Sequence, residues 1–247
     1  MTTDAQSHPA RSPDELSRRA WRSREARWSG LALIVGGAML FAVMTHHPEP
    51  RAADMESFLA EVRGLAALSR WVHGGALAAM LMLVFGFFGL AHSVDRFSVR
   101  LRASLVLFAF GSLAGAAAGV LNGFLAPGLA ERYEGAEAAT LESLRPVLRA
   151  SREIADLCAR SSVVGWSAAL VLVGWFLWSG ARHGRHGSRW VGGLAVLCGV
   201  PPLASIFAGW LDVDVFGYTL FVASQVVWFV VAGIWLRRTA SDLSTES

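Results

Sequence analysis

Charged residues are scarce in this chain and unevenly placed. Of its 247 residues, 17 % are charged and 54 % are hydrophobic, whereas a soluble domain has about 25 % charged residues. Uncharged runs extend over residues 28–48, 71–94, 103–130, 161–181, 190–211 and 215–236. Each run is long enough for a helix to cross the hydrocarbon core, which takes about 20 residues. The composition therefore excludes an ordinary soluble domain and predicts an integral membrane protein.

The chain also lacks the alternating segments of about 10 residues that build membrane β-barrels. Within lipid every backbone N–H and C=O needs an internal partner, so long apolar runs form helices. The predicted fold class is all-α, a polytopic membrane bundle of six transmembrane helices with short outer amphipathic helices. The bundle is expected over residues 28–238, with spans at about 29–45, 71–92, 103–125, 161–180, 190–209 and 216–236.

Lysine is absent, so all 22 basic residues are arginines, which we attribute to genome composition. These arginines flank the apolar runs, so the formal charge of +3 does not indicate nucleic-acid binding. Fourteen of them fall on the side of the two termini and eight on the other. Basic residues are enriched in cytoplasmic loops, so both termini are expected in the cytoplasm. Residues 1–27 are predicted to be a disordered basic tail and residues 239–247 a second cytoplasmic tail.

Two outer segments, 46–70 and 126–160, connect the spans on the opposite side. Within them, residues 52–69 and 138–158 carry apolar side chains at spacings of three and four, which is typical of amphipathic helices. We expect the first to lie over the outer mouth of the bundle or in the interface. The second is expected to run on into the fourth span.

Cysteines and catalytic signatures are also scarce. Cys158 lies at the outer edge of the fourth predicted span and Cys198 near the middle of the fifth, about 15 Å apart in depth by helical rise, whereas bridged cysteines need Cα atoms within about 7 Å. The sequence contains no HExxH motif and no complete nucleophile elbow. The sequence therefore favours a protein without enzymatic activity and without a cofactor, and it leaves both questions open.

Small residues and prolines indicate how the spans pack. Glycines recur at every fourth position of the third span, where they form a groove for close approach of a neighbouring helix, expected within the chain; they are Gly111, Gly115, Gly119 and Gly123. The pair Pro201-Pro202 interrupts the fifth span and removes backbone donors near Leu197 and Cys198. Such kinks are ordinary in membrane helices, and broken helices also line the substrate sites of transporters.

Polar side chains near the membrane are costly and mark candidate sites. Several of them share a depth at the outer side, and Gln225 lies near the middle of the sixth span. The predicted ligand-binding residues are His47, His73, Asn122, Arg160, Asp212 and Gln225. Imidazoles bind transition metals. A functional interpretation of His46, His47 and His73 is therefore that they bind a metal ion. The structural alternative is a set of interfacial residues hydrogen-bonded to loops and water.

Several short motifs carry a family resemblance. They are His47-Pro48, Trp71-Val72-His73, Gly89-Leu90-Ala91 and Asn122-Gly123-Phe124. In these motifs and in its hydropathy plan the chain resembles a broad group of six-helix bacterial membrane proteins of unknown function. The resemblance implies a bacterial inner-membrane protein and no particular activity, and it adds interest to His47, His73 and Asn122.

Three functions remain open at this point. The leading hypothesis is a non-enzymatic bundle that binds a small molecule, a lipid or a membrane partner protein at its outer face. The second is a small-solute transporter, suggested by Pro201-Pro202 and Gln225. The third is a metal- or haem-binding redox protein, in which His47 and His73 would form an outer pair of ligands.

Overall fold

The structure is a computed structural model that describes residues 13–48, 50, 52, 54–95, 98–180, 187–210 and 215–245. Over this part of the chain the fold is helical and contains no strand, which confirms the predicted class. The elements are α1 (Pro13–Met44), α2 (Met55–Gly64), α3 (Ala66–Asp95), α4 (Val99–Val120), a π-helical turn η1 (Leu121–Leu125), α5 (Ala126–Arg132), α6 (Ala138–Gly180), α7 (Gly187–Phe207) and α8 (Val215–Thr245).

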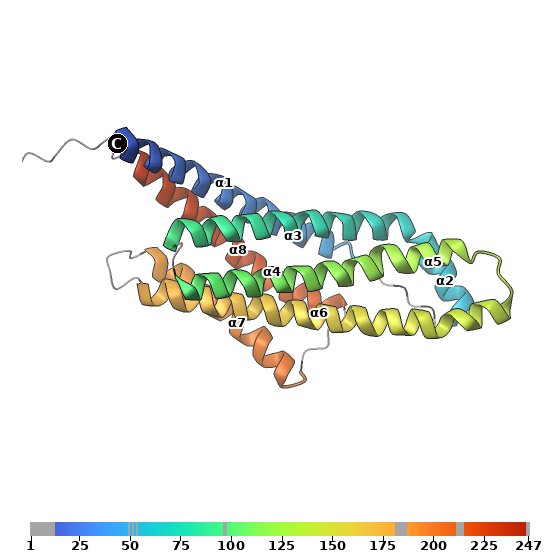
Figure 1. Cartoon of the computed structure of the whole chain (residues 1–247). Helices are drawn as coiled ribbons and strands as arrows, with labels where there is room; N and C mark the ends of the chain where they lie inside the picture. The colour runs from blue at the N-terminus through green and yellow to red at the C-terminus, as the bar shows by residue number, and fades with distance from the viewer. Residues whose placement is uncertain are drawn as a thin grey trace, which may run out of the picture.

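Six helices are long and apolar enough to cross a membrane. They are α1, α3, the continuous stretch from α4 through α5, α6, α7 and α8, and together they make a multi-pass membrane protein. The start of α1 and the end of α8 lie at the same end of the bundle, together with the end of α3, the start of α4, the end of α6 and the start of α7 (Figure 1). The other end carries α2, α5 and the first half of α6, and we call it the outer end.

Several helices extend further than the sequence predicted. The tail predicted as disordered over 1–27 is helical from Pro13 onward, because this segment is rich in Arg with some Glu and Ala, which are good helix formers. Likewise α8 continues to Thr245, into the predicted C-terminal tail. The length of an apolar run predicts which part of a helix lies in lipid. It does not predict how far the helix continues into water beyond the membrane.

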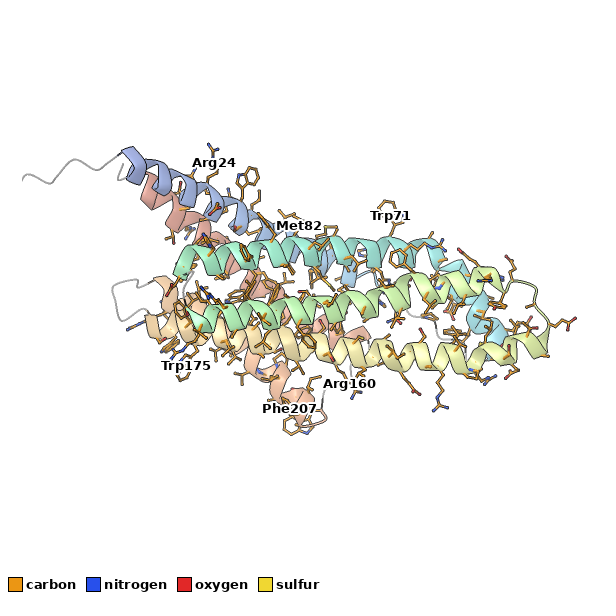
Figure 2. All side chains as sticks on the ribbon, viewed as in Figure 1. Arg24, Trp71, Met82, Arg160, Trp175 and Phe207 are labelled. Atoms are coloured by element: carbon orange, nitrogen blue, oxygen red, sulfur yellow. The ribbon has the colours of Figure 1, made fainter. Side chains whose placement is uncertain are left out.

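The membrane-facing surface is apolar, as a lipid solvent requires. Large side chains such as Trp71, Trp175 and Phe207 project outward from the bundle (Figure 2). They are 63–82 % exposed. In water such a surface would be an aggregation liability, whereas in a bilayer it is the face in contact with acyl chains.

The spans form a closed ring in chain order, and the ring consists of two units of three helices. The most extensive contacts join α3 to α1 and α1 to α8 in one unit, and α4 to α6 and α6 to α7 in the other. The seams between the units, α3 against α4 and α7 against α8, are in looser contact.

Glycines lie at the helix crossings within each unit. A Cβ added to Gly165 of α6 would lie 2.7 Å from the Cα of Gly111 on α4, and one added to Gly233 of α8 would lie 2.5 Å from the carbonyl oxygen of Gly30 on α1. Gly174 of α6 meets the backbone of α7 in the same way. These contacts join backbone to backbone, which suits a lipid solvent that gives apolar side chains no reason to associate.

An aromatic cluster fills the ring at the α3–α4 seam, toward the end of the bundle at which α1 starts. Phe87 of α3 stacks on Phe108 of α4 with ring centroids 4.4 Å apart, and Trp166 of α6 and Phe229 of α8 also contact Phe108. All four side chains are fully buried. Large rings close this seam, where no glycine crossing brings the backbones together.

Replacing Gly165 by Ala should destabilise the bundle, because the new methyl group meets backbone atoms of α4 that cannot rotate away. Overpacking of this kind costs about 1–3 kcal/mol. The measurement is thermal unfolding of the detergent-purified protein. Gly128→Ala is the matched control, since a Cβ there meets nothing within 4 Å; equal loss in both variants would contradict the proposed role of the crossing.

Candidate functional site

A pocket opens at the outer end, on the seam between the two units. Its volume is about 300 Å³, and its walls come from α3, α4, η1, α5, α6 and α8, with α2 and the segment after α1 as a roof. Its polar lining residues are His47, Ser69, His73, Asn122, Ser151, Arg152, Asp156 and Tyr218. Apolar and small side chains, including Ala76, Met80, Gly115 and Ala118, line its deeper part.

Two histidines meet at the pocket. His47, in the segment after α1, places Nε2 3.2 Å from Nε2 of His73 on α3, and the two rings meet edge to face with centroids 4.9 Å apart. His73 is buried, with 5 % of its surface exposed. His47 is partly buried.

Hydrogen bonds fix the protonation pattern of this pair. His73 Nδ1 lies 2.8 Å from the carbonyl oxygen of Ser69, and a carbonyl only accepts, so Nδ1 carries a proton. In a neutral His73 ring Nε2 is then an unprotonated acceptor. The neutral pair is therefore joined by a proton on Nε2 of His47 that points to Nε2 of His73.

The glycine stripe of the third span serves two purposes. Gly111 and Gly115 face α6, where a Cβ would approach Trp166 and Ser162. Further along, Gly123 faces His73, and a Cβ there would lie 2.3 Å from the His73 Cβ. A Cβ on Gly119 would lie in ordinary contact with the same ring, 3.7 Å from Cδ2. The outer half of the stripe is thus a slot for an imidazole rather than a second helix crossing.

The π-helical turn η1 lies directly beside this slot. The backbone carbonyl of Asn122 in this turn has no backbone donor, and Pro127 is the reason. In the five-residue spacing of a π-helix, the N–H of residue 127 would reach the carbonyl of Asn122, but proline has no N–H. The Ser69 hydroxyl donates to that carbonyl instead, over a long 3.4 Å. Ser69 thus supports both the free carbonyl of Asn122 and the His73 ring. π-Turns occur frequently at functional sites.

The electrostatics of the pocket favour a neutral histidine pair. Burial, followed by the nearby His73, lowers the pKa of His47 from its ordinary 6.5 to about 4. At neutral pH His47 is therefore uncharged. Arg152 and Asp156, one turn apart on α6, bring opposite charges to the pocket wall, and the Tyr218 hydroxyl lies 3.5 Å from the Ser162 hydroxyl at its deep end.

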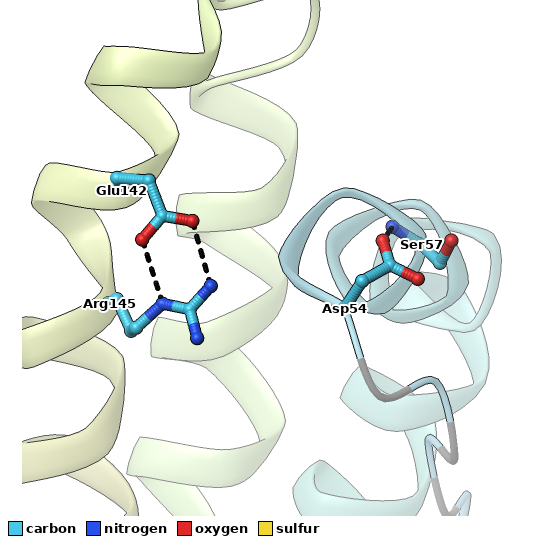
Figure 3. A network of polar contacts seen from close by, with 4 residues as sticks. All are labelled: Asp54, Ser57, Glu142 and Arg145. Atoms are coloured by element: carbon cyan, nitrogen blue, oxygen red, sulfur yellow. Dashed lines mark hydrogen bonds and ion pairs between the residues drawn. The ribbon is translucent and has the colours of Figure 1, made fainter.

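The roof of the pocket is held by polar contacts around α2. Asp54 caps this helix by accepting the N–H of Ser57 at 2.9 Å (Figure 3), a bond that lowers the pKa of the Asp54 carboxyl. Glu61 accepts the N–H of Ala52 at 3.0 Å and so ties the preceding segment to α2. Leu59 and Val62 of α2 are buried in a small apolar cluster with Ala130 of α5.

One ion pair joins the roof to the turn after α5, and two others lie on the elements around it. Arg63 of α2 contacts Glu134 at 3.1 Å, and Arg70 of α3 pairs with Glu131 of α5. On α6, Arg145 makes two hydrogen bonds with Glu142, at 2.7 and 2.9 Å (Figure 3). Exposed pairs of this kind contribute about 0–1 kcal/mol each, so the apolar cluster and the α2 cap contribute most to holding the roof.

The structure brings together three of the predicted site residues, because His47, His73 and Asn122 all line the pocket. His46 is exposed, and its Nδ1 lies 2.9 Å from the carbonyl of Ala42, away from the His47–His73 pair. Arg160 is exposed on α6 (Figure 2), whereas its neighbour Ala159 lines the pocket. Asp212 lies outside the described residues.

Gln225 contacts the backbone next to the proline pair. Its Nε2 donates to the carbonyl of Cys198 at 2.8 Å, and the side chain is fully buried. Cys198 is four residues before Pro202, so its carbonyl is the one that the missing proline N–H leaves free. Gln225 of α8 thus supplies the donor that the backbone of α7 lacks, and the hydrogen bond crosses the seam between α7 and α8. The two features that suggested a transporter form one interhelical contact.

The histidine geometry bears on the cofactor hypotheses. A bis-histidine haem needs its macrocycle between the two nitrogens, and direct contact at 3.2 Å leaves no space for one. No cluster of three or more His, Cys, Asp or Glu side chains suited to a metal occurs in the part of the chain that the structure describes. The metal hypothesis is thereby reduced from three histidines to the pair His47 and His73.

Sequence reasoning missed several pocket residues. Ser69 lies one helical turn before His73, so the four-residue spacing could have revealed it. Arg152 and Asp156 lie within the predicted amphipathic segment, but which way they face depends on the neighbours of α6. Tyr218 offered no signal beyond its position near the outer start of the last span.

Comparison with family models, with curated proteins and with solved structures found no match to this chain. The function is therefore inferred from the geometry of the pocket.

Acidification should destabilise the protein through His47. Its pKa is about 4 in the folded chain and about 6.5 when unfolded, so between these values only the unfolded chain takes up the proton. Stability should therefore fall as the pH drops from 6.5 to about 4. Thermal unfolding across this range, with a chelator present, tests this, and His47→Gln should lose that part of the slope. An unchanged slope in His47→Gln would contradict the assignment.

The Gln225 contact predicts a double-mutant coupling. Gln225→Met should destabilise the bundle by about 0.6–1.7 kcal/mol, the range of hydrogen bonds between membrane helices, because the Cys198 carbonyl loses its donor. In a Pro202→Ala background, the new backbone N–H can reach that carbonyl, so the same change should cost less. Unfolding measurements on the wild type, both single variants and the double variant give the coupling. Purely additive effects would contradict the link between Gln225 and Pro202.

Proposed function

We propose that the protein binds a small amphiphilic molecule, a lipid or lipid-like compound, in the outer pocket. The observation that supports this most directly is a cavity of about 300 Å³ whose lining changes character with depth. This volume is at the lower end of the range for small-molecule sites, about 300–1,000 Å³. The occupant would therefore be a small headgroup with a short or partly inserted chain.

The gradient of polarity follows two facing walls. Along α3 the lining runs from Ser69 and His73 at the outer side to Ala76 and Met80, a depth of about 16 Å by helical rise. Along the facing wall it runs from Asn122 to Gly115. An amphiphile would place its polar group at the histidine pair and its apolar part toward Met80, where the Tyr218 hydroxyl is an additional polar contact.

The proposal includes an orientation in the membrane. By their place in the sequence, fourteen of the 22 arginines flank the spans on the side of the two termini, which favours cytoplasmic termini. The family resemblance favours a bacterial inner membrane. The pocket would then open on the outer side of that membrane, beside the outer leaflet, where a lipid-like ligand is available. No observation on the described residues favours the transporter or an enzyme over binding.

Ligand-dependent stabilisation tests the proposal. Palmitate and lysophosphatidylethanolamine are the probes, and the thermal unfolding of detergent-purified protein is the measurement, because a ligand at 100 times its Kd stabilises by about 2.7 kcal/mol. Native mass spectrometry of the same sample detects any molecule that co-purifies. We expect stabilisation by at least one probe or a co-purifying lipid-like molecule.

A variant that fills the pocket gives the specific readout. Ala159→Phe adds a ring at the pocket wall and should reduce stabilisation and co-purification at least about tenfold, as a clash of 1.4 kcal/mol or more would. Leu157→Phe is the matched control, since Leu157 is 65 % exposed on the same helix. The proposal is overturned if the wild type shows neither stabilisation nor a bound molecule. It is also overturned if Ala159→Phe and Leu157→Phe show the same stabilisation by the probes and the same amount of co-purifying molecule.

A further inference from the structure

We propose that His47 and His73 bind one divalent transition-metal ion of the zinc type through their Nε2 atoms. The pair is the one place in the described chain where two imidazole nitrogens converge beside a cavity. The inference uses the same pocket as the proposed function but does not depend on it, since a metal can bind there whether or not an amphiphile does.

The separation of the two nitrogens matches a tetrahedral site. Zinc–nitrogen bonds of about 2.0–2.1 Å at tetrahedral angles place neighbouring ligand nitrogens about 3.3 Å apart. A square-planar site, as copper(II) or nickel(II) prefers, would place them about 2.8–2.9 Å apart. The observed 3.2 Å between Nε2 of His47 and Nε2 of His73 is close to the tetrahedral value. It is also at the long end of the range for a hydrogen bond from nitrogen.

The surroundings orient His73 as metal sites orient their histidines. A metal-bound imidazole almost always donates its other N–H to a carbonyl or carboxylate, which fixes the ring and its tautomer. His73 donates Nδ1–H to the Ser69 carbonyl at 2.8 Å, and Gly123 and Gly119 form a slot around the ring. Its Nε2 is therefore held as an unprotonated ligand. His47 would bind by the same atom after moving its proton to Nδ1.

The open coordination positions would belong to the pocket. Since the described residues hold no third His, Cys, Asp or Glu in a suitable cluster, water would fill them, or an oxygen of the bound amphiphile. A zinc ion with free positions is typical of a site that polarises or anchors a ligand rather than one that holds a fold together. A carboxylate or phosphate headgroup would then have a cation to bind at the polar end of the pocket.

Metal binding to the full-length protein in mild detergent tests the inference. The protein is stripped with a chelator and dialysed, and is then titrated separately with Zn²⁺, followed by elemental analysis after gel filtration, and with Co²⁺, followed by visible absorption. We expect one ion per chain and the intense cobalt spectrum of a tetrahedral site. His47→Ala and His73→Gln should each weaken binding by at least about 100-fold, since even the loss of a supporting contact around a metal ligand costs 10–100-fold.

Adjacent His46 provides the matched control. It is exposed and faces away from the pair, so His46→Ala should bind metal as the wild type does. His47 lies in a segment after α1, and its replacement leaves the spans intact; gel filtration and thermal unfolding of each variant check the fold. The inference is overturned if the folded wild type retains no stoichiometric metal, or if His47→Ala binds like the wild type. Equal loss in His46→Ala also overturns it, since the metal would then sit on the surface. The metal titrations contain no lipid probe. A negative result for metal binding therefore leaves the test of lipid binding unaffected.

Discussion

Backbone-to-backbone contact at glycines is the constraint on which the rest of this bundle depends. In a bilayer a leucine side chain has about the same free energy in contact with lipid as in contact with another helix. Apolar side chains alone therefore do not drive helices to associate. Helices that approach closely gain dispersion contacts instead, and approach is closest where neither has a side chain. The crossings Gly111–Gly165 and Gly30–Gly233 provide this contact, and they lie within the two three-helix units rather than between them.

The pocket follows from that arrangement. Between the units the seams lack glycine crossings and are closed by other means: the Phe87–Phe108 stack toward the inner side, and the bond from Gln225 to the Cys198 carbonyl at α7 and α8. At the outer end of the α3–α4 seam, His73 fills part of the space. The small residues of α4 leave the remainder open under α2. The cavity thus lies where the contact between the two units is loose.

Prolines contribute to both seams through the same chemistry. Each removes one backbone donor in a segment where water cannot replace it. The side chain of Gln225 supplies a donor for the carbonyl that Pro202 leaves free, and Ser69 does so for the carbonyl opposite Pro127. In the sequence Gln225 looks like a ligand candidate because it is polar and deep, but in the structure it serves the backbone. Ser69, which the sequence analysis did not single out, serves the backbone and lines the pocket.

By itself the sequence determined the six spans, the outer helix that runs on into the fourth span, and the shared end at which α1 starts and α8 finishes. Those properties depend on local composition: the length of an apolar run, the period of its side chains and the position of arginines. The first outer helix is shorter than the predicted 52–69, because α2 covers Met55–Gly64 and the residues from Ala66 onward belong to α3. The sequence also indicated that His47, His73 and Asn122 lie at one depth. Only the tertiary structure decided which residues of that depth meet. Depth along a helix leaves its rotation free, and the rotation is fixed by neighbours distant in sequence. For this reason His47 reaches His73 while the adjacent His46 and the equally deep Arg160 face elsewhere.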